Sequence, residues 1–402
     1  MSHTTLLEVR TPSGRIVLER LSWKPIRALA GVFTVVLLVG ACTRATPAPP
    51  PGARLPGGTA SPPGTIVIDG SSTVAPIMSA LAEEFARTPE GRGIRVTVGT
   101  SGTGGGFKKF CAGSPELRTD IQDASRPIRP EEDDACRRNQ VAYIELPVAI
   151  DGIAVVVNPQ NTWAGCLTVG ELRRMWEPSA EGRITRWRQV RRTFPDRPLR
   201  LAGPGADSGT FDAFTELVVG QAKASRGDYQ ATEDDNVTVQ FVQRDVGALG
   251  YFGLAYLEEN LDRVKGVAID PTGRVELASD AACRGVPPTF DTVRAGTYRP
   301  LTRPLFLYVN LTSAKTKPEV QAFVSYALGT SGIRKRVADP RRAGQRTTFV
   351  RAVGYVEFPE VVYEQALRCF EARRTGTAFV QGGRAAGHAQ VADVLREVRR
   401  CP

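Results

Sequence analysis

Three short segments rich in serine, threonine and glycine carry residue types that could bind a small anion. They are Gly70–Thr73, Gly99–Gly106 and Gly203–Thr210, and each precedes apolar residues that recur at helical spacing. A helix N-terminus presents unpaired N–H groups and the positive end of the helix dipole. Glycine lets an oxyanion approach the backbone, and hydroxyl groups add further donors. The three segments therefore predict a cradle for a small oxyanion.

The glycine-rich segment does not match the known nucleotide-binding loops. A P-loop requires lysine after its last glycine, but Phe107 follows Gly106 here. Phe107 also occupies the third glycine position of the dinucleotide fingerprint. A single segment of this kind could serve simply as a tight turn, and a serine at a helix start could serve simply as an N-cap. Three such segments in one chain favour binding of a free oxyanion.

Arg126 is a candidate counter-charge for the anion, because arginine offers a bidentate fork and stays charged. Its position alone fits an exposed arginine equally well. Residues that could catalyse a reaction are scarce. The two histidines are His3 and His388, and the sequence contains neither a G-x-S-x-G motif nor a cluster of carboxylates at metal-binding spacing. The sequence therefore predicts a protein that holds its ligand, with no catalytic residues, no metal and no cofactor.

The elements that must position these segments alternate between strand and helix. Strands are expected at 65–69, 94–98 and 199–201, each followed by a polar loop and a helix. This alternation predicts an α/β fold with mostly parallel sheets. Two further apolar strands, at 152–158 and 305–309, could carry the chain between two lobes.

The N-terminal region is typical of an exported lipoprotein. Basic residues precede an apolar run, Ala28–Ala41, which is short for a membrane span but suits a signal peptide. The run ends Leu-Val-Gly-Ala-Cys42 and resembles a bacterial lipobox, so we expect a signal peptide at 1–41 and lipidation of Cys42. An uncleaved anchor with an incidental cysteine is the alternative. Residues 42–64 read as a Pro/Gly-rich tether, which places the protein on the outer face of the cytoplasmic membrane, in the periplasm or at the cell surface.

The net charge is positive but dispersed. The chain carries a formal charge of +10. Residues 1–41 hold five of its Lys and Arg and two of its Asp and Glu, which leaves +7 on the remainder. Anions, anionic lipid and nucleic acid could all bind such a protein. Because the charges are scattered, we favour a solvated surface and expect no nucleic-acid partner.

Six cysteines remain after Cys42, and an even number outside the cytoplasm suggests disulfides. Pairing between nearest neighbours in the sequence is the simplest hypothesis, and it is least secure for the second pair. The predicted pairs are Cys111–Cys136, Cys166–Cys283 and Cys369–Cys401. Without a C-x-x-C motif, neither a zinc site nor a redox motif is expected.

Several motifs, taken in order, resemble one family. They are Asp69–Pro76, Thr100–Phe107, Ala124–Ile128, Asp207–Phe211, Glu233–Asn236 and Gly247–Gly253. The chain resembles, over residues 65–355, the PstS-type phosphate-binding proteins that serve the high-affinity phosphate ABC transporter. The resemblance implies a two-lobed periplasmic-binding-protein-like fold with two crossings between the lobes. Residues 65–152 and 302–402 would form lobe I, and 153–301 would form lobe II.

The resemblance also implies what the protein does. Phosphate would bind in the cleft between the lobes and be delivered to the permease subunits by a protein that is monomeric and has no enzymatic activity. The residues expected to contact it are Ser72, Thr73, Ser101, Thr103, Arg126, Asp207, Ser208, Gly209 and Thr210.

One departure from the family bears on selectivity. In well-known members a carboxylate stands where this chain has Arg126, and an arginine precedes the Ser-Gly-Thr motif. A carboxylate can accept the hydrogen bond of a protonated phosphate and repel sulfate. Asp207 is our candidate for this acceptor, with an N-cap of the following helix as the alternative.

Other functions stay open at this stage. They are binding of sulfate or molybdate, and a phosphatase-like, sensor or adhesion protein of the cell envelope that uses the same cradle. The segment 356–402 contains a helix pattern at Val361, Val362, Ala366 and Phe370, and it could cap the first lobe.

Overall fold

A computed structural model describes residues 6–10, 16–20, 64–206, 208–232, 234–275, 277, 280–340, 344–381, 384–386, 389–397 and 401. The chain divides into two units, Met1–Thr59 and Ala60–Pro402. In the first unit, β1 (Leu6–Arg10) pairs antiparallel with β2 (Ile16–Arg20). The expected lipidation site Cys42 lies outside the described residues, as does the tether except for Gly64. Among the described helices, none is long and apolar enough to cross a membrane.

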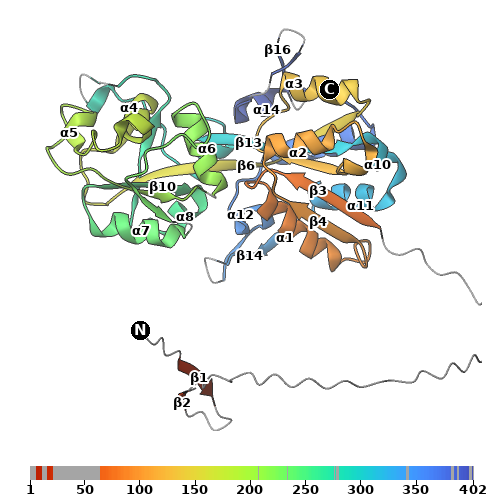
Figure 1. Ribbon diagram of the computed structural model, residues 1–402, viewed down its shortest axis with the longest axis horizontal. Coiled ribbons are helices and arrows are strands. Elements are labelled where there is room, and N and C mark those ends of the chain that lie inside the picture. The colour runs from red at the N-terminus through yellow and green to blue at the C-terminus, as the bar shows by residue number, and fades with distance from the viewer. Residues whose placement is uncertain are drawn as a thin grey trace, which may run out of the picture. The chain divides into compact units, whose positions relative to one another are not determined.

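The second unit is built on one sheet that runs through both of its halves (Figure 1). The strand order is β4-β3-β5-β13-β6-β10-β8-β9, with β11 also paired to β6. The strands are β3 (Thr65–Gly70), β4 (Arg95–Gly99), β5 (Ile121–Ala124), β6 (Tyr143–Val157), β8 (Arg200–Pro204), β9 (Gln230–Thr232), β10 (Ala248–Gly253), β11 (Lys265–Gly266) and β13 (Thr302–Asn310). Both β6 and β13 are buried along their whole length and join the two halves, as expected for the crossing strands.

Fewer of the strand pairs are parallel than the alternation of strands and helices in the sequence predicted. Within each half, β3 pairs parallel with β4 and β5, and β8 pairs parallel with β9 and β10. At the centre, β13 runs antiparallel to both β5 and β6, and β6 runs antiparallel to β10. The physical reason is that β13 brings the chain back across the molecule beside the strand that carried it out.

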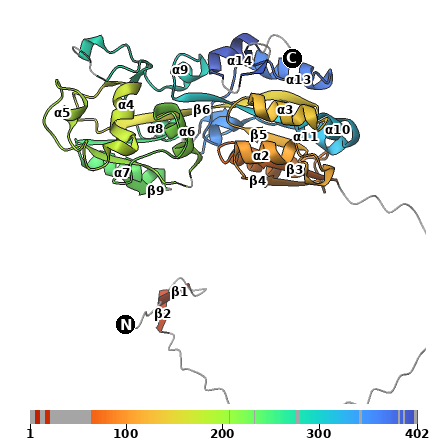
Figure 2. The same cartoon turned by 45° about the horizontal axis from the view of Figure 1, so that its top comes forward.

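Helices cover the sheet in each half (Figures 1 and 2). In the first lobe they are α1 (Ala75–Ala86), α2 (Thr103–Phe110), α3 (Pro130–Arg138), α10 (Leu311–Thr316) and α11 (Pro318–Leu328). In the second lobe they are α4 (Val169–Trp176), α5 (Trp187–Val190), α6 (Gly209–Val218), α7 (Asp235–Arg244), α8 (Leu254–Glu259) and α9 (Phe290–Arg294). The helix after β3 forms as predicted, with Ile77, Met78, Leu81 and Phe85 on its buried face.

The remaining elements are short, apart from one helix of 12 residues, Glu360–Glu371. They are β7 (Cys166–Thr168), β12 (Ala268–Asp270), β14 (Arg336–Ala338), β15 (Arg346–Thr348), β16 (Val380–Gln381), β17 (Arg384–Ala385), α12 (Phe349–Ala352), α13 (Glu360–Glu371), α14 (Val391–Glu397) and the 3-10 helices η1 (Pro115–Leu117), η2 (Pro178–Ala180) and η3 (Asp280–Ala282).

The C-terminal segment packs against the crossing strands. The Tyr363 hydroxyl of α13 donates to Val148 O on β6 at 3.1 Å, and the Phe379 ring lies 5.4 Å from that of Phe306 on β13. The predicted helix in this segment is present as α13.

All three disulfides pair as predicted, between nearest neighbours in the sequence. Cys111–Cys136 joins the end of α2 to α3, Cys166–Cys283 spans 117 residues, and Cys369–Cys401 ties the C-terminus to α13.

Candidate functional site

The loop between β3 and α1 is held rigidly at the edge of the first lobe. A side chain at Gly70 would lie 2.0 Å from Asp123 O, so only glycine fits at this close approach. Ser71 Oγ accepts from Thr73 N at 3.2 Å, and the Tyr355 hydroxyl donates to Thr73 O at 2.7 Å. These bonds fix Thr73, which is 7% exposed, at the start of α1.

The N-terminus of α6 in the second lobe faces this loop directly. Ser208 Oγ accepts from Thr210 N at 3.2 Å, which makes Ser208 the N-cap of α6. A Cβ atom on Gly209 would lie 2.6 Å from Thr73 Oγ1 and 3.1 Å from Ser72 Oγ. Two of the three predicted segments, one from each lobe, are therefore in contact.

A cavity of about 450 Å³ opens beside this contact. Ser72, Thr73, Ser208, Gly209 and Thr210 all line it, as do Asp151 and Tyr355 from the crossing strand and the C-terminal region. The hydroxyls predicted for the first and third segments thus share one cavity between the lobes. Asp207, the predicted acceptor of a hydrogen bond from phosphate, lies outside the described residues.

Arg303 stands at the junction of the two loops, although sequence reasoning did not find it. Its Nη2 donates to Thr73 Oγ1 at 2.6 Å and to Gly209 O at 3.1 Å. Its Nε pairs with Asp151 Oδ2 at 3.1 Å. The available signal was a charged residue inside each of two apolar strands, because Arg303 lies in β13 and Asp151 in β6.

The second predicted segment uses its hydroxyls locally. Ser101 donates to Asp69 Oδ1 from both its backbone N, at 3.0 Å, and its Oγ, at 2.8 Å. Burial alone would raise the pKa of Asp69, but hydrogen bonds from Lys109 and Ser101 outweigh it and hold that pKa below its usual value. Thr103 Oγ1 lies 3.1 Å from Ser125 Oγ. The structure places both predicted residues at the start of α2 but does not join them to the Thr73–Gly209 contact.

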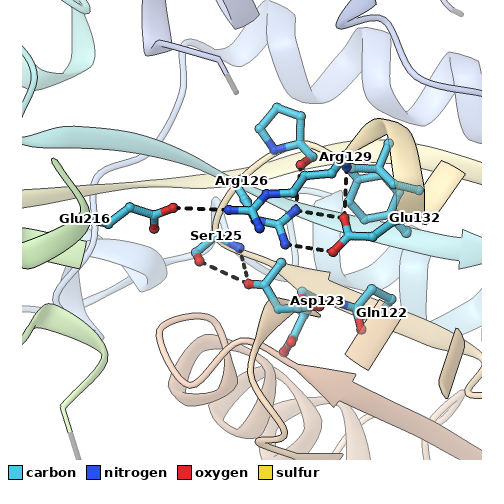
Figure 3. A network of polar contacts seen from close by, with 11 residues as sticks. Gln122, Asp123, Ser125, Arg126, Arg129, Glu132 and Glu216 are labelled. Carbon is cyan, nitrogen blue, oxygen red and sulfur yellow. Dashed lines mark hydrogen bonds and ion pairs between the residues drawn. The ribbon is translucent and has the colours of Figure 1, made fainter. Parts of the chain in front are cut away.

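Arg126 is engaged by a carboxylate of its own lobe (Figure 3). Its two terminal nitrogens each donate to one oxygen of Glu132 at 2.8 Å. Burial opposes its charge, yet the hydrogen bonds and negative charge of Glu132 raise the pKa of Arg126 above its usual value. Arg126 therefore stays cationic, while its charge is balanced within the first lobe.

A buried carboxyl lies beneath the first loop. Asp123, at the end of β5, is fully buried, and neither of its carboxylate oxygens has a hydrogen-bond partner among the described residues. Burial, with a smaller contribution from the charge of Asp69, raises the pKa of Asp123 to about 8. Asp123 is therefore mainly protonated at neutral pH. Sequence reasoning missed it because only the fold shows that this carboxyl group is buried.

Comparisons with known proteins agree on one family. The family described as the PBP superfamily domain matches residues 57–331. Protein SphX of Synechocystis sp. is 43% identical over 333 residues, which cover 83% of this chain and 89% of SphX. The phosphate-binding protein PstS of Staphylococcus saprophyticus is 35% identical over 271 residues, which cover 67% of this chain and 77% of that protein. The chain belongs to the PstS-type phosphate-binding proteins of the PBP superfamily.

A solved structure supports the same placement among PstS-type proteins. The crystal structure of a possible phosphate binding protein from Planctomyces limnophilus is 42% identical, with a TM-score of 0.65, and the match covers 78% of this chain and 99% of that one. The resemblance seen in the sequence and the two-lobed α/β fold are thereby confirmed. The ligand-binding residues and the lobe boundaries at 152/153 and 301/302 stay predictions.

Proposed function

We propose that this PstS-type protein binds inorganic phosphate between its lobes and delivers it to an ABC permease. The observation that carries the proposal is the contact between the two helix N-termini, where Thr73 of the first lobe meets Gly209 of the second. Such termini supply N–H groups and hydroxyls, and Arg303 adds a cation that touches both lobes. The name of the Staphylococcus saprophyticus relative, a phosphate-binding protein at 35% identity, supports the choice of anion.

Binding requires no chemical step in this proposal. A phosphate dianion leaves water only where donors replace its hydration, so it must be enclosed from both sides. Ser72 and Thr73 would donate from the first lobe, and Ser208, Gly209 and Thr210 from the second. Ser101, Thr103 and Arg126 would complete the site only if their present bonds rearranged. The Asp207 carboxylate would accept the hydrogen bond that the protonated oxygen of the ligand donates.

The proposed location follows from the N-terminal sequence. We infer an exported protein that is anchored through lipid on Cys42 and tethered by residues 42–64, and that acts as a monomer beside its permease. Mass spectrometry of the membrane-bound protein should find a chain that begins at Cys42 and carries lipid on that residue. A chain that still contains residues 1–41 and has no lipid on Cys42 would instead favour the uncleaved apolar anchor.

Calorimetry tests the proposed ligand. Residues 43–402 would be purified, stripped of bound anion by partial unfolding and dialysis, and titrated at pH 7 with phosphate, sulfate and molybdate. One-to-one binding of phosphate, with at least about 100-fold weaker binding of sulfate, is expected. Preference for sulfate or molybdate would reassign the ligand, and binding of none of the three would refute the proposal.

A further inference from the structure

We propose that Arg303, and not Arg126, is the cation that faces the bound anion, and that its pairing with Asp151 couples anion binding to lobe closure. This inference rests on the proposed function. It assigns the charge of the site to a residue outside every motif that led to the family.

Arg303 lies where the helix starts of the two lobes meet. Its Nη2 reaches Thr73 Oγ1 at 2.6 Å and Gly209 O at 3.1 Å, so one nitrogen contacts the helix start of each lobe. Its side chain is only 10% exposed. An anion held between these helix starts would therefore lie against the guanidinium group.

The guanidinium group of Arg303 has donors that could bind an anion. Among the described residues, Arg303 bonds to protein through Nε and Nη2, and a guanidinium group has two more N–H donors on its other terminal nitrogen. Because Thr73 Oγ1 accepts from Arg303, the Thr73 hydroxyl must direct its own hydrogen elsewhere. The Thr73 hydroxyl donates to Gly209 O at 3.5 Å, which is long for a hydrogen bond. An anion oxygen could accept a shorter hydrogen bond from this hydroxyl instead.

Arg126 differs from Arg303 in how it is paired with a carboxylate. Both terminal nitrogens of Arg126 are bound to the two oxygens of Glu132, at 2.8 Å each, in a bidentate pair within one lobe. Arg303 meets Asp151 through Nε alone. An anion could thus bind to Nη1 of Arg303 without displacing Asp151, whereas at Arg126 it would have to compete with the Glu132 carboxylate.

The pair of Asp151 and Arg303 lies on the strands that connect the lobes. Asp151 and Arg303 are directly opposite each other in the register of β6 and β13, the two strands that cross between the lobes. The guanidinium group is therefore fixed at the crossing, and it can contact Gly209 O only when the second lobe has approached the first. An anion bound to Arg303 and to the start of α6 would favour this closed arrangement.

Matched variants in the residue 43–402 protein test the inference. Arg303→Met and Arg126→Met each remove the charge while keeping an unbranched side chain. Calorimetry should show phosphate binding weakened at least about 100-fold by R303M and less than about threefold by R126M. Small-angle scattering should show that phosphate reduces the radius of gyration of wild type and R126M but not of R303M.

A second pair of variants, Arg303→Lys and Arg126→Lys, tests the same inference if the first pair does not fold. If R303M fails to fold, Arg303→Lys keeps the charge but loses the planar fork, and it should bind about tenfold more weakly than wild type, with R126K unchanged. Wild-type affinity in R303M or R303K, or loss of binding in R126M alone, would overturn the inference while the proposed function stands. If wild type binds sulfate instead of phosphate, the proposed function fails, and the same variants test Arg303 against sulfate. If wild type binds none of the three anions, both proposals are refuted.

Discussion

Replacement of Gly209 by alanine should hinder closure of the two lobes around an anion. The added Cβ would lie 2.6 Å from Thr73 Oγ1 and 3.0 Å from Thr73 N, across the boundary between the lobes. Gly209 is not among the residues with positive φ, so alanine can adopt its backbone conformation. The obstacle is therefore contact between the lobes and not strain within α6.

The size of the effect follows from the distances. Ordinary contacts of a Cβ atom begin near 3.4 Å, so the 2.6 Å approach to Thr73 Oγ1 must lengthen considerably. Rotation of the Thr73 side chain would relieve the contact only by breaking its hydrogen bond with Arg303. Overpacking of this kind costs about 1–3 kcal/mol, which corresponds to phosphate binding weakened by about 5- to 150-fold.

Calorimetric titration of G209A with phosphate measures this effect, and Gly104→Ala is the matched control. Gly104 also lies in the first turn of a predicted anion-binding helix, but its added Cβ would be 3.8 Å from both Arg126 Nη2 and Glu132 Oε1. G104A should bind phosphate as wild type does. Wild-type affinity in G209A, or equal losses in the two variants, would refute the reasoning that closure presses Gly209 against Thr73.

Three further predictions concern the fold. Burial raises the pKa of Asp123 to about 8, so between pH 4 and 8 the folded state retains a proton that the unfolded state releases, and its stability falls as pH rises. In urea unfolding of Asp123→Asn, up to about 5 kcal/mol of this fall in the free energy of unfolding should be absent. Parallel curves of unfolding free energy against pH for the variant and wild type would contradict the raised pKa of Asp123. Glu171→Gln should cost about 3–5 kcal/mol because it removes the carboxylate that pairs with the fully buried Arg191, whereas Glu177→Gln, which removes a carboxylate from the largely exposed pair with Arg173, should cost under about 1 kcal/mol. Equal losses in these two variants would argue against the burial effect. Cys401→Ser opens a disulfide of sequence separation 32 and should lower the free energy of unfolding, measured without reductant, by about 4 kcal/mol. An unchanged value would show that the bond leaves the unfolded chain unconstrained.

Local patterns were sufficient to predict much of the fold. The starts of α1, α2 and α6 were visible because each combines a polar loop with apolar residues at helical spacing. The two crossing strands were visible as apolar runs, and the disulfide pairs followed from order along the chain.

The site was harder to predict because its contacts are distant in sequence. Arg303 contacts Thr73 across 230 positions, and Tyr355 contacts it across 282. No spacing rule links such residues, since their meeting depends on the register of β13 on β6. The engagement of Arg126 by Glu132 also depends on where α3 begins, which the sequence pattern did not define.

The continuous sheet has a mechanical consequence for how such a molecule could open. Because β6 and β13 pair with each other along the whole of β13, rotation of one lobe against the other would act as torsion on a two-stranded ribbon. Torsion can be spread over many residues, so each dihedral angle would change by a few degrees while the ladder of backbone hydrogen bonds persisted. The ladder is irregular between Leu305 and Phe306, two residues beyond Arg303. Opening would therefore twist the β6–β13 ribbon, most easily between Leu305 and Phe306. The amide protons of the ribbon would stay protected from solvent exchange while the lobes open and close.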